Sequence, residues 1–190
     1  MDRKYEEDRG GIESNTVGVY RTAATVKGGR RFSFSAMVVC GDRQGNVGLG
    51  YGKANQVPNA IEKAQKKAKR AMRAFPLTGT TIPHEVTGRF GACSVRLVPA
   101  SPGTGVIAGA AVRAVLDLVG VQDCLSKAYG STNNKNLSKA VLDGLQQLRS
   151  RDKIQTLRKV EIDKTHAEEA HQGTQSEAKV TAVSVEDAAE

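Results

Sequence analysis

The segment Val47–Lys53 constrains the fold of this chain most strongly. The side chains of Val47, Leu49 and Tyr51 alternate with three glycines, so one face of the predicted strand has no side chains at all. Glycine weakens a strand, and three at alternate positions need a structural reason. Either another backbone, of protein or of nucleic acid, comes very close to this face, or the segment is a bent edge strand. Both interpretations stay open at this point.

Two more strands are predicted before this segment. Residues 14–26 favour β structure, and residues 32–40 alternate in polarity, which predicts a strand with Phe32 and Phe34 on its buried face. Turns are predicted at Lys27–Arg31, which holds two glycines, and at residues 41–46.

The clearest helical pattern follows, from Val57 to Phe75, with Pro58 in its first turn and Pro76 at its end. Its apolar stripe is mostly alanine, and its opposite side is basic, with Glu62 the one acid in it. A solvated helix normally mixes signs, so this face is typical of contact with a polyanion. A membrane-surface helix is the alternative, but alanine gives weak affinity for a bilayer. The β-β-β-α order resembles a double-stranded-RNA-binding domain.

The second half predicts an α+β module. Strands are expected at residues 83–90 and 92–98, a largely buried helix at residues 106–119, a polar loop at residues 128–134 and a last helix capped by Asn136. An arginine on a buried helix needs a partner. Arg113 is therefore expected either to pair with Asp117, four residues on, or to contact another macromolecule.

Charge is distributed unevenly along the chain. The total is +8, but residues 161–190 carry −6 and residues 1–13 carry −2, which leaves +16 for residues 14–160. So basic a region usually binds nucleic acid or an anionic membrane. The acidic end, lacking aromatic residues, is expected to be a disordered tail. No transmembrane helix or signal peptide is predicted, and three widely spaced cysteines are expected to be free thiols.

One motif suggests enzyme chemistry. Gly103–Ala108 matches the glycine pattern of a dinucleotide-binding turn, with Asp123 twenty residues further on. Too little chain follows for the rest of such a fold, so a small nucleotide-binding enzyme is a minor alternative. A free regulator that binds double-stranded RNA is another.

Several long motifs, in one order and spacing, resemble the bacterial small-subunit ribosomal protein S5 family. They are Val26–Arg30, Phe32–Phe34, Val47–Ala54, Val57–Ile61, Pro99–Gly109, Arg113–Leu116 and Lys127–Asn133. The resemblance covers about residues 14–150. Arg31, where an apolar residue is common, and the acidic tail depart from it.

The resemblance implies a double-stranded-RNA-binding-like domain (14–78) followed by a C-terminal α+β domain (79–160). Composition predicts a flexible N-terminus (1–13) before them and the acidic disordered tail (161–190) after them. The resemblance also implies a structural, non-enzymatic protein of the cytoplasmic ribosome, which binds ribosomal RNA, contacts ribosomal proteins S4 and S8 and contributes to subunit assembly and decoding accuracy. No cofactor, metal, membrane or small-molecule substrate is expected.

Residue by residue, we expect an RNA-binding set and a smaller protein-contact set. The RNA-binding residues are expected to be Arg21, Lys27, Gly28, Gly29, Arg30, Arg31, Lys53, Lys63, Lys66, Lys67, Lys69, Arg70 and Arg73. By the resemblance, the loop Lys27–Arg31 reaches ribosomal RNA near the spectinomycin site, and Gly103, Gly105 and Arg113 lie towards S4.

Overall fold

The computed structural model describes residues 6, 7 and 11–159, and the chain divides into two units, residues 1–148 and 149–190. In the second unit the described part holds the helix α4 (Arg151–Arg158), capped by Ser150, whose hydroxyl accepts a hydrogen bond from the amide of Lys153. The expected acidic tail lies outside the described residues, as does most of the expected flexible N-terminus. All the other described elements belong to the first unit.

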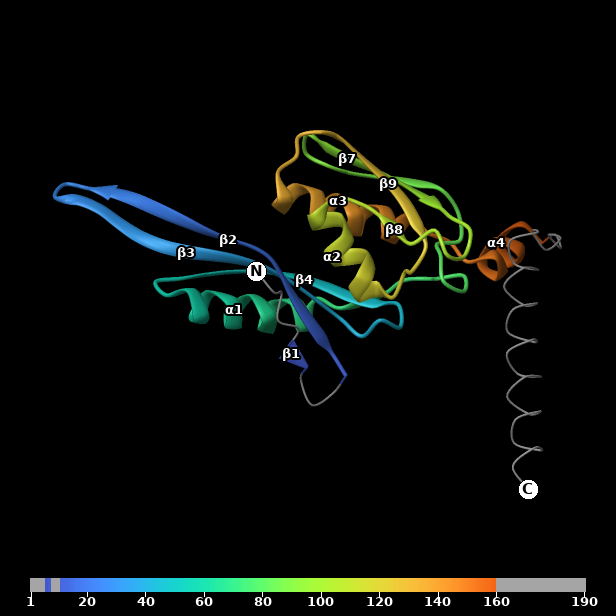
Figure 1. Cartoon of the computed structure of the whole chain (residues 1–190), viewed down its shortest axis with the longest axis horizontal. Coiled ribbons are helices and arrows are strands. Elements are labelled where there is room, and N and C mark those ends of the chain that lie inside the picture. The colour runs from blue at the N-terminus through green and yellow to red at the C-terminus, as the bar shows by residue number, and fades with distance from the viewer. Residues whose placement is uncertain (1–5, 8–10, 160–190) are drawn as a thin grey trace, which may run out of the picture. The chain divides into compact units, whose positions relative to one another are not determined.

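An antiparallel sheet forms the N-terminal half of the first unit (Figure 1). Its strands lie side by side in chain order: β1 (Glu6–Glu7), β2 (Glu13–Val26), β3 (Gly29–Gly41), β4 (Asn46–Ala54) and β5 (Arg73–Ala74). The turn between β2 and β3 is shorter than predicted, because Gly29 already pairs with Val26. The predicted strands are confirmed.

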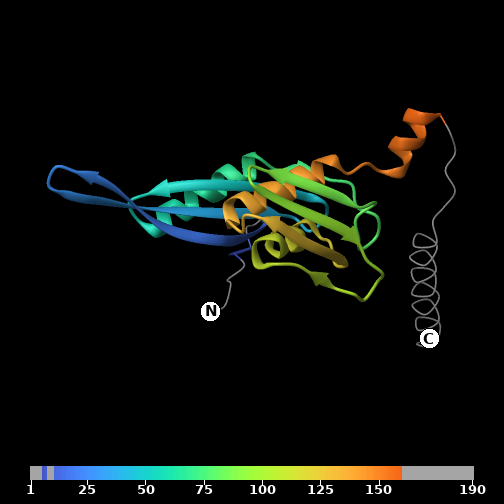
Figure 2. The same ribbon diagram turned by 90° about the horizontal axis from the view of Figure 1, so that it is seen from above.

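The β2–β3 hairpin continues beyond the rest of this sheet. β3 pairs with β4 only from Phe34 onward, so the residues before it pair with β2 alone. Residues 22–33 therefore form a two-stranded ribbon that runs past β4, and together with the pair Arg21–Phe34 at its base they are called the arm below (Figures 1 and 2). Such a ribbon exposes both of its faces to solvent or to a partner.

The glycine face of β4 lies against the helix α1 (Val57–Arg70). A Cβ on any of its three glycines would overlap a backbone carbonyl oxygen of the helix, as at Gly50 against Ala64. The helix side of the contact consists of the buried residues Ala60, Ala64 and Ala68. Of the two interpretations, the close approach of a protein backbone is confirmed. β5 pairs with β4 only at Asn46 and Val47, so from Gly48 onward β4 pairs with β3 alone.

α1 ends earlier than predicted. The helical pattern extended to Phe75, but the helix stops at Arg70, and Arg73 then pairs with Val47 as part of β5. The amide of Phe75 donates to the carbonyl of Gly45, and its side chain is buried. The reason is that Phe75 joins the core on the face of the sheet opposite α1, which a continuing helix could not reach.

A second sheet forms the C-terminal half of this unit. Its strands lie in the order β6 (Val86–Phe90), β7 (Cys93–Pro99), β9 (Cys124–Gly130) and β8 (Val106–Ile107), and β8 runs parallel to β9. The helix α3 (Asn134–Gln147) packs against β6 and β7. The helix α2 (Ala110–Val119) packs against α3 and also against β2, β3 and β4.

Three local predictions in this half are wrong. The helix expected at residues 106–119 begins at Ala110, because the first residues of that apolar run form β8; an apolar run does not distinguish a buried strand from a helix. The loop expected at residues 128–134 begins only after Gly130, where β9 ends. Asn133 rather than Asn136 caps α3, since its side chain accepts from the amide of Lys135.

The two sheets share one hydrophobic core. Val39, Val47 and Phe75 of the N-terminal half belong to the same buried cluster as α2, β7 and α3. Backbone hydrogen bonds reinforce the contact: the amide of Arg43 donates to the carbonyl of Leu118 at 3.1 Å. The expected α+β class and the β-β-β-α order are confirmed. The boundary between residues 78 and 79 stays a prediction.

Candidate nucleic-acid interface

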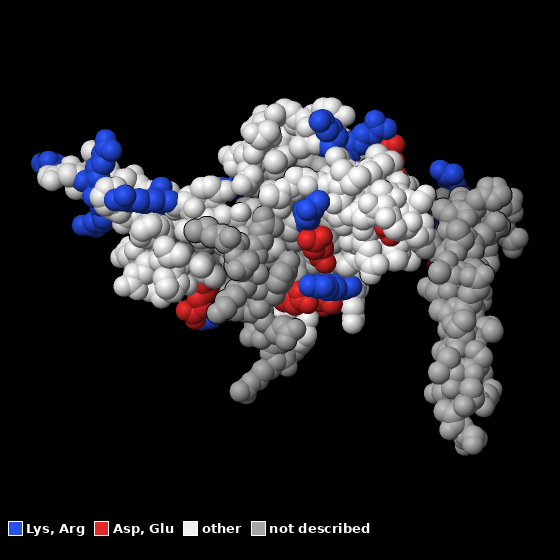
Figure 3. Space-filling view, in the orientation of Figure 1, with Lys and Arg blue, Asp and Glu red and all other residues white. Residues whose placement is uncertain are grey.

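The arm presents a group of the predicted RNA-binding cations. Arg21, Lys27, Arg30 and Arg31 are all exposed. Figure 3 shows Lys and Arg side chains crowded along this ribbon, at the left of the view, with no acidic side chain visible beside them. Because this two-stranded ribbon extends beyond β4, its cations lie away from the body of the sheet. The arm can therefore enter a space that the globular part cannot.

Phe32 lies on the surface of the arm, and the prediction that it is buried is wrong. Its side chain is 46% exposed, because β4 does not reach this part of β3. The guanidinium carbon of Arg21 stands 3.7 Å from the centroid of the Phe32 ring, a cation–π contact. This contact holds one predicted cation in a defined place. Phe34, nearer the body, is half-buried against the α1 cluster.

The outer face of α1 carries a second group of predicted cations, all exposed: Lys63, Lys66, Lys67, Lys69 and Arg70. The small alanines hold the opposite face against the sheet, so these long side chains point away from it. Three of the cations lie in the last turn, where the helix dipole favours positive charge. The Nζ atom of Lys66 pairs with Oε1 of Glu62 at 2.6 Å, and this lowers the pKa of Glu62.

Two further predicted cations lie apart from the α1 face. Lys53 is exposed near the end of β4, opposite Ser35 on β3. Arg73 is on β5 beside Val47, at the other end of β4, so the structure does not place it on the helix. The predicted RNA-binding set thus falls into the arm and the α1 face, with single cations at the two ends of β4. Exposed cations with few acids nearby suit the neutralisation of phosphates.

The glycine turn of the second half is held by the protein's own carboxylate. The amide of Gly105 donates to Oδ1 of Asp123 at 2.9 Å, and Asp123 is 4% exposed. In a dinucleotide site this amide would face a pyrophosphate and the acid would bind a ribose. Here the two groups bind each other. The geometry therefore speaks against the nucleotide-binding enzyme considered above.

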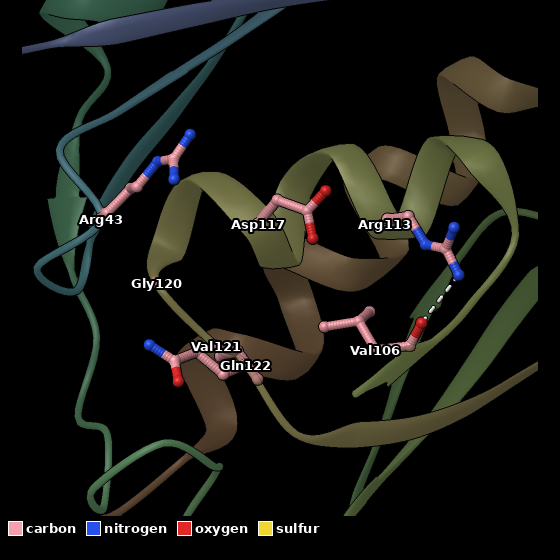
Figure 4. Close-up of a pocket in the computed structure, with 7 residues that line it drawn as sticks. All are labelled: Arg43, Val106, Arg113, Asp117, Gly120, Val121 and Gln122. Atoms are coloured by element: carbon pink, nitrogen blue, oxygen red, sulfur yellow. Dashed lines mark hydrogen bonds between the residues drawn. The ribbon is translucent and has the colours of Figure 1, made fainter. Parts of the chain in front are cut away.

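An open hollow of about 580 Å³ lies beside this turn (Figure 4). Figure 4 shows Arg113 bending towards β8, where its Nη2 atom donates to the carbonyl of Val106 at 2.8 Å. Gly103 is exposed, and both glycines of the turn have left-handed backbone angles, with φ of 86° and 76°. The hollow is lined by Arg43, Val106, Arg113, Asp117, Gly120, Val121 and Gln122.

The three cysteines are buried, as free thiols. Burial raises the pKa of Cys40 and of Cys124 to about 11, so both stay protonated near neutral pH. Within residues 6, 7 and 11–159, no group of three or more His, Cys, Asp or Glu side chains is placed to hold a metal ion. In the same part of the chain, no helix is long and apolar enough to cross a membrane.

The sequence reasoning missed cations that the fold brings next to aromatic rings. The Nζ atom of Lys135 lies 4.6 Å from the ring centroid of Tyr20 and 4.9 Å from that of Tyr51. No local pattern could have found this contact, since Tyr20 is on β2 and Lys135 is in the first turn of α3. The alternation of Ser94 and Arg96 predicted a polar or partner-facing side of β7, but Arg89 on β6 and Lys127 on β9 were missed.

Comparison with known proteins gives a consistent result over most of the chain. Residues 12–76 match the family model described as ribosomal protein S5, N-terminal domain, and residues 88–158 match the model of the C-terminal domain. A protein of Rhodopirellula baltica is 53% identical over 153 residues, 80% of this chain and 86% of the relative. One of Syntrophobacter fumaroxidans is 56% identical over 146 residues, 77% of this chain and 88% of the relative. Both are described as small ribosomal subunit protein uS5.

Proposed function

The chain belongs to the ribosomal protein S5 family, and on that premise we propose that it is a structural protein of the small ribosomal subunit, which binds ribosomal RNA and has no catalytic activity of its own. The observation that carries the RNA-binding role is the exposure of every predicted cation on the arm and α1. The identities of about 50% to curated relatives support the assignment to the ribosome.

The binding mechanism we propose is recognition of shape and charge. The arm enters between RNA segments, with Arg21 fixed on Phe32 and Lys27, Arg30 and Arg31 near its tip. The exposed face of α1 lies along a phosphate backbone, as in a double-stranded-RNA-binding domain. Each phosphate contact releases counterions, so the affinity should fall steeply with salt.

The second half is proposed to hold protein neighbours. The turn that holds Gly103 and Gly105 lies beside the open hollow, and Arg113 lines that hollow. This arrangement suits a contact with ribosomal protein S4. We also propose that the chain contacts ribosomal protein S8 and contributes to subunit assembly and to decoding accuracy. The left-handed angles of the two glycines make this turn sensitive to substitution, since any side chain would strain the backbone.

Sedimentation of the tagged full chain from cells of its source organism tests the proposed function. We expect the tagged protein in the small-subunit fraction, and its release by high salt together with other ribosomal proteins. A chain that stays at the top of the gradient, at a normal expression level, would contradict the ribosomal role. Recovery only on free RNA would favour an independent RNA-binding regulator.

A further inference from the structure

The C-terminal sheet has one face that no described helix covers. α3 packs against one side of β6 and β7, and in Figure 1 the strands β7 and β9 lie above α3 and α2, at the upper edge of the molecule. The strand pattern agrees, because Val95 and Leu97 are buried towards α3 whereas Arg96 between them is exposed. This uncovered side of β6, β7 and β9 is called the outer sheet face below.

The strand register places six outward side chains of this face in two adjacent rows. In the first row Arg89, Ser94 and Tyr129 are neighbours across β6, β7 and β9. In the second row Thr87, Arg96 and Lys127 are neighbours in the same way. All six side chains can donate hydrogen bonds, and none is an acid. The rows form a compact patch of donors, and its long side chains, Arg89, Arg96, Lys127 and Tyr129, are exposed.

The six residues of this patch together carry positive charges and include no acid that would balance them. Arg96 and Lys127 lie directly opposite each other on β7 and β9, an arrangement of like charges that destabilises a sheet. Glu85, just before β6, pairs with Nε of Arg96 at 2.6 Å, which uses one of the five donors of that guanidinium. Figure 3 shows Lys and Arg side chains, with an acidic side chain beside them, at the upper edge of the view, where β7 and β9 lie in Figure 1.

We propose that the outer sheet face is a second RNA-binding surface, separate from the arm and α1. Arg89, Arg96 and Lys127 would bind phosphates of ribosomal RNA, and Tyr129, Ser94 and Thr87 would bond to phosphate or ribose oxygens. The inference rests on the proposed function and extends it, because it adds RNA contacts to the half of the chain assigned to protein neighbours. The next row beyond Arg96 and Lys127 is apolar and consists of Val98, Leu125 and Ile107. This apolar row limits the cationic surface on the side of β8.

The test is the salt dependence of binding between the full chain and transcribed small-subunit ribosomal RNA. Two lost phosphate contacts should flatten the log–log slope by about 1.5, since each contributes roughly 0.7–0.9. We therefore expect that slope change, and weaker binding, for Arg96→Gln with Lys127→Gln. The exchange Arg96→Lys with Lys127→Arg keeps both charges and should keep the slope. Thermal unfolding of each variant shows whether the fold is retained.

A matched control removes two exposed lysines of the second unit, Lys153→Gln with Lys159→Gln. If it flattens the slope as much as the sheet variant does, net charge explains the effect and the second surface is wrong. An unchanged slope for the sheet variant would also overturn it. Variants of the arm, Lys27→Gln with Arg30→Gln, are measured in parallel. If they lose binding while the sheet variant does not, the proposed function stands and only this inference fails.

Photo-cross-linking in assembled subunits separates RNA from protein as the occupant. The photoreactive residue p-benzoylphenylalanine replaces Ser94, which is half-buried in the centre of the first row. A cross-link to RNA supports the proposal. A cross-link to a ribosomal protein would overturn it and make the outer sheet face a protein-docking surface.

Discussion

Gly50 illustrates how a missing side chain determines the packing of a whole helix. Its Cβ position would overlap the carbonyl oxygen of Ala64, and the neighbouring glycines of β4 meet α1 in the same way. With no room for a methyl group, the helix backbone rests directly on the strand backbone. The alanines of α1 complete this contact, because larger residues would hold the two elements apart.

We predict that Gly50→Ala destabilises the protein by about 3 kcal/mol, since overpacking of a tight contact typically costs 1–3 kcal/mol and here the obstacle is backbone. Urea denaturation measures the change. Gly28→Ala is the control, because a Cβ at Gly28 meets no atom within 4 Å and its stability should hardly change. Equal stability of the two variants would mean that α1 does not pack on β4 as described.

At the scale of elements, α1 combines two roles in one helix. Its alanine face holds it on β4, and its opposite face carries the exposed cations. The two roles use different residues, so charge can be removed without disturbing the packing. This separation allows a clean test of the RNA-binding face.

We predict that Lys66→Ala with Arg70→Ala weakens binding to ribosomal RNA and flattens its salt dependence by about 1.5 in log–log slope, through two lost phosphate contacts. Filter binding over a range of salt concentrations measures both effects. The variant Lys66→Arg with Arg70→Lys keeps the charges and should behave as the parent does. A slope that does not change on alanine substitution would remove the α1 face from the interface.

At the scale of the first unit, α2 joins the two sheets. Leu118 is fully buried in the shared core, and its carbonyl accepts the amide of Arg43 from the turn between β3 and β4. Gly120 ends the helix with φ of 100°, close against the backbone of Arg43. Residues 11–148 should therefore unfold as one cooperative unit.

We predict that Leu118→Ala destabilises this unit by about 2–5 kcal/mol, the usual cost of a cavity in a core. Hydrogen exchange should show lost protection both in β3–β4 and in β7–β9, because α2 packs on β3 and β4 directly and shares the buried core of the second sheet through α3 and β8. Leu157→Ala on α4, where the side chain is 66% exposed, is the control and should have little effect. Lost protection confined to β7–β9 would contradict the shared core.

The whole chain adds one electrostatic prediction. Residues 165–190 contain six acids and one lysine, and they lie outside the described residues. Removing them makes the chain more positive, so we predict that the truncated chain binds unrelated RNA more tightly at low salt. Fluorescence anisotropy with a random-sequence RNA measures this. Identical affinities of the full and truncated chains would indicate that the acidic segment does not limit RNA binding.

Local patterns allowed much of this structure to be predicted. The alternation in residues 32–40, the glycines of β4 and the alanine stripe of α1 each describe contacts between elements close in the chain. The predictions for Phe32 and Phe75 failed because another element, and not the local pattern, decided the outcome. Phe32 is exposed because β4 stops short of it, and Phe75 leaves the helix because the core that takes it is built largely from residues after 80.

The sequence by itself determined the α+β class, the N-terminal element order, the family and the basic character of the arm and α1. These properties depend on side-chain periodicity and on local charge. Only the tertiary structure decided that Asp123 occupies the glycine turn, that α2 joins both sheets, and that Arg89, Arg96 and Lys127 share a face. The physical reason is that strand register and helix packing bring together residues far apart in the chain, and no local pattern records such neighbours.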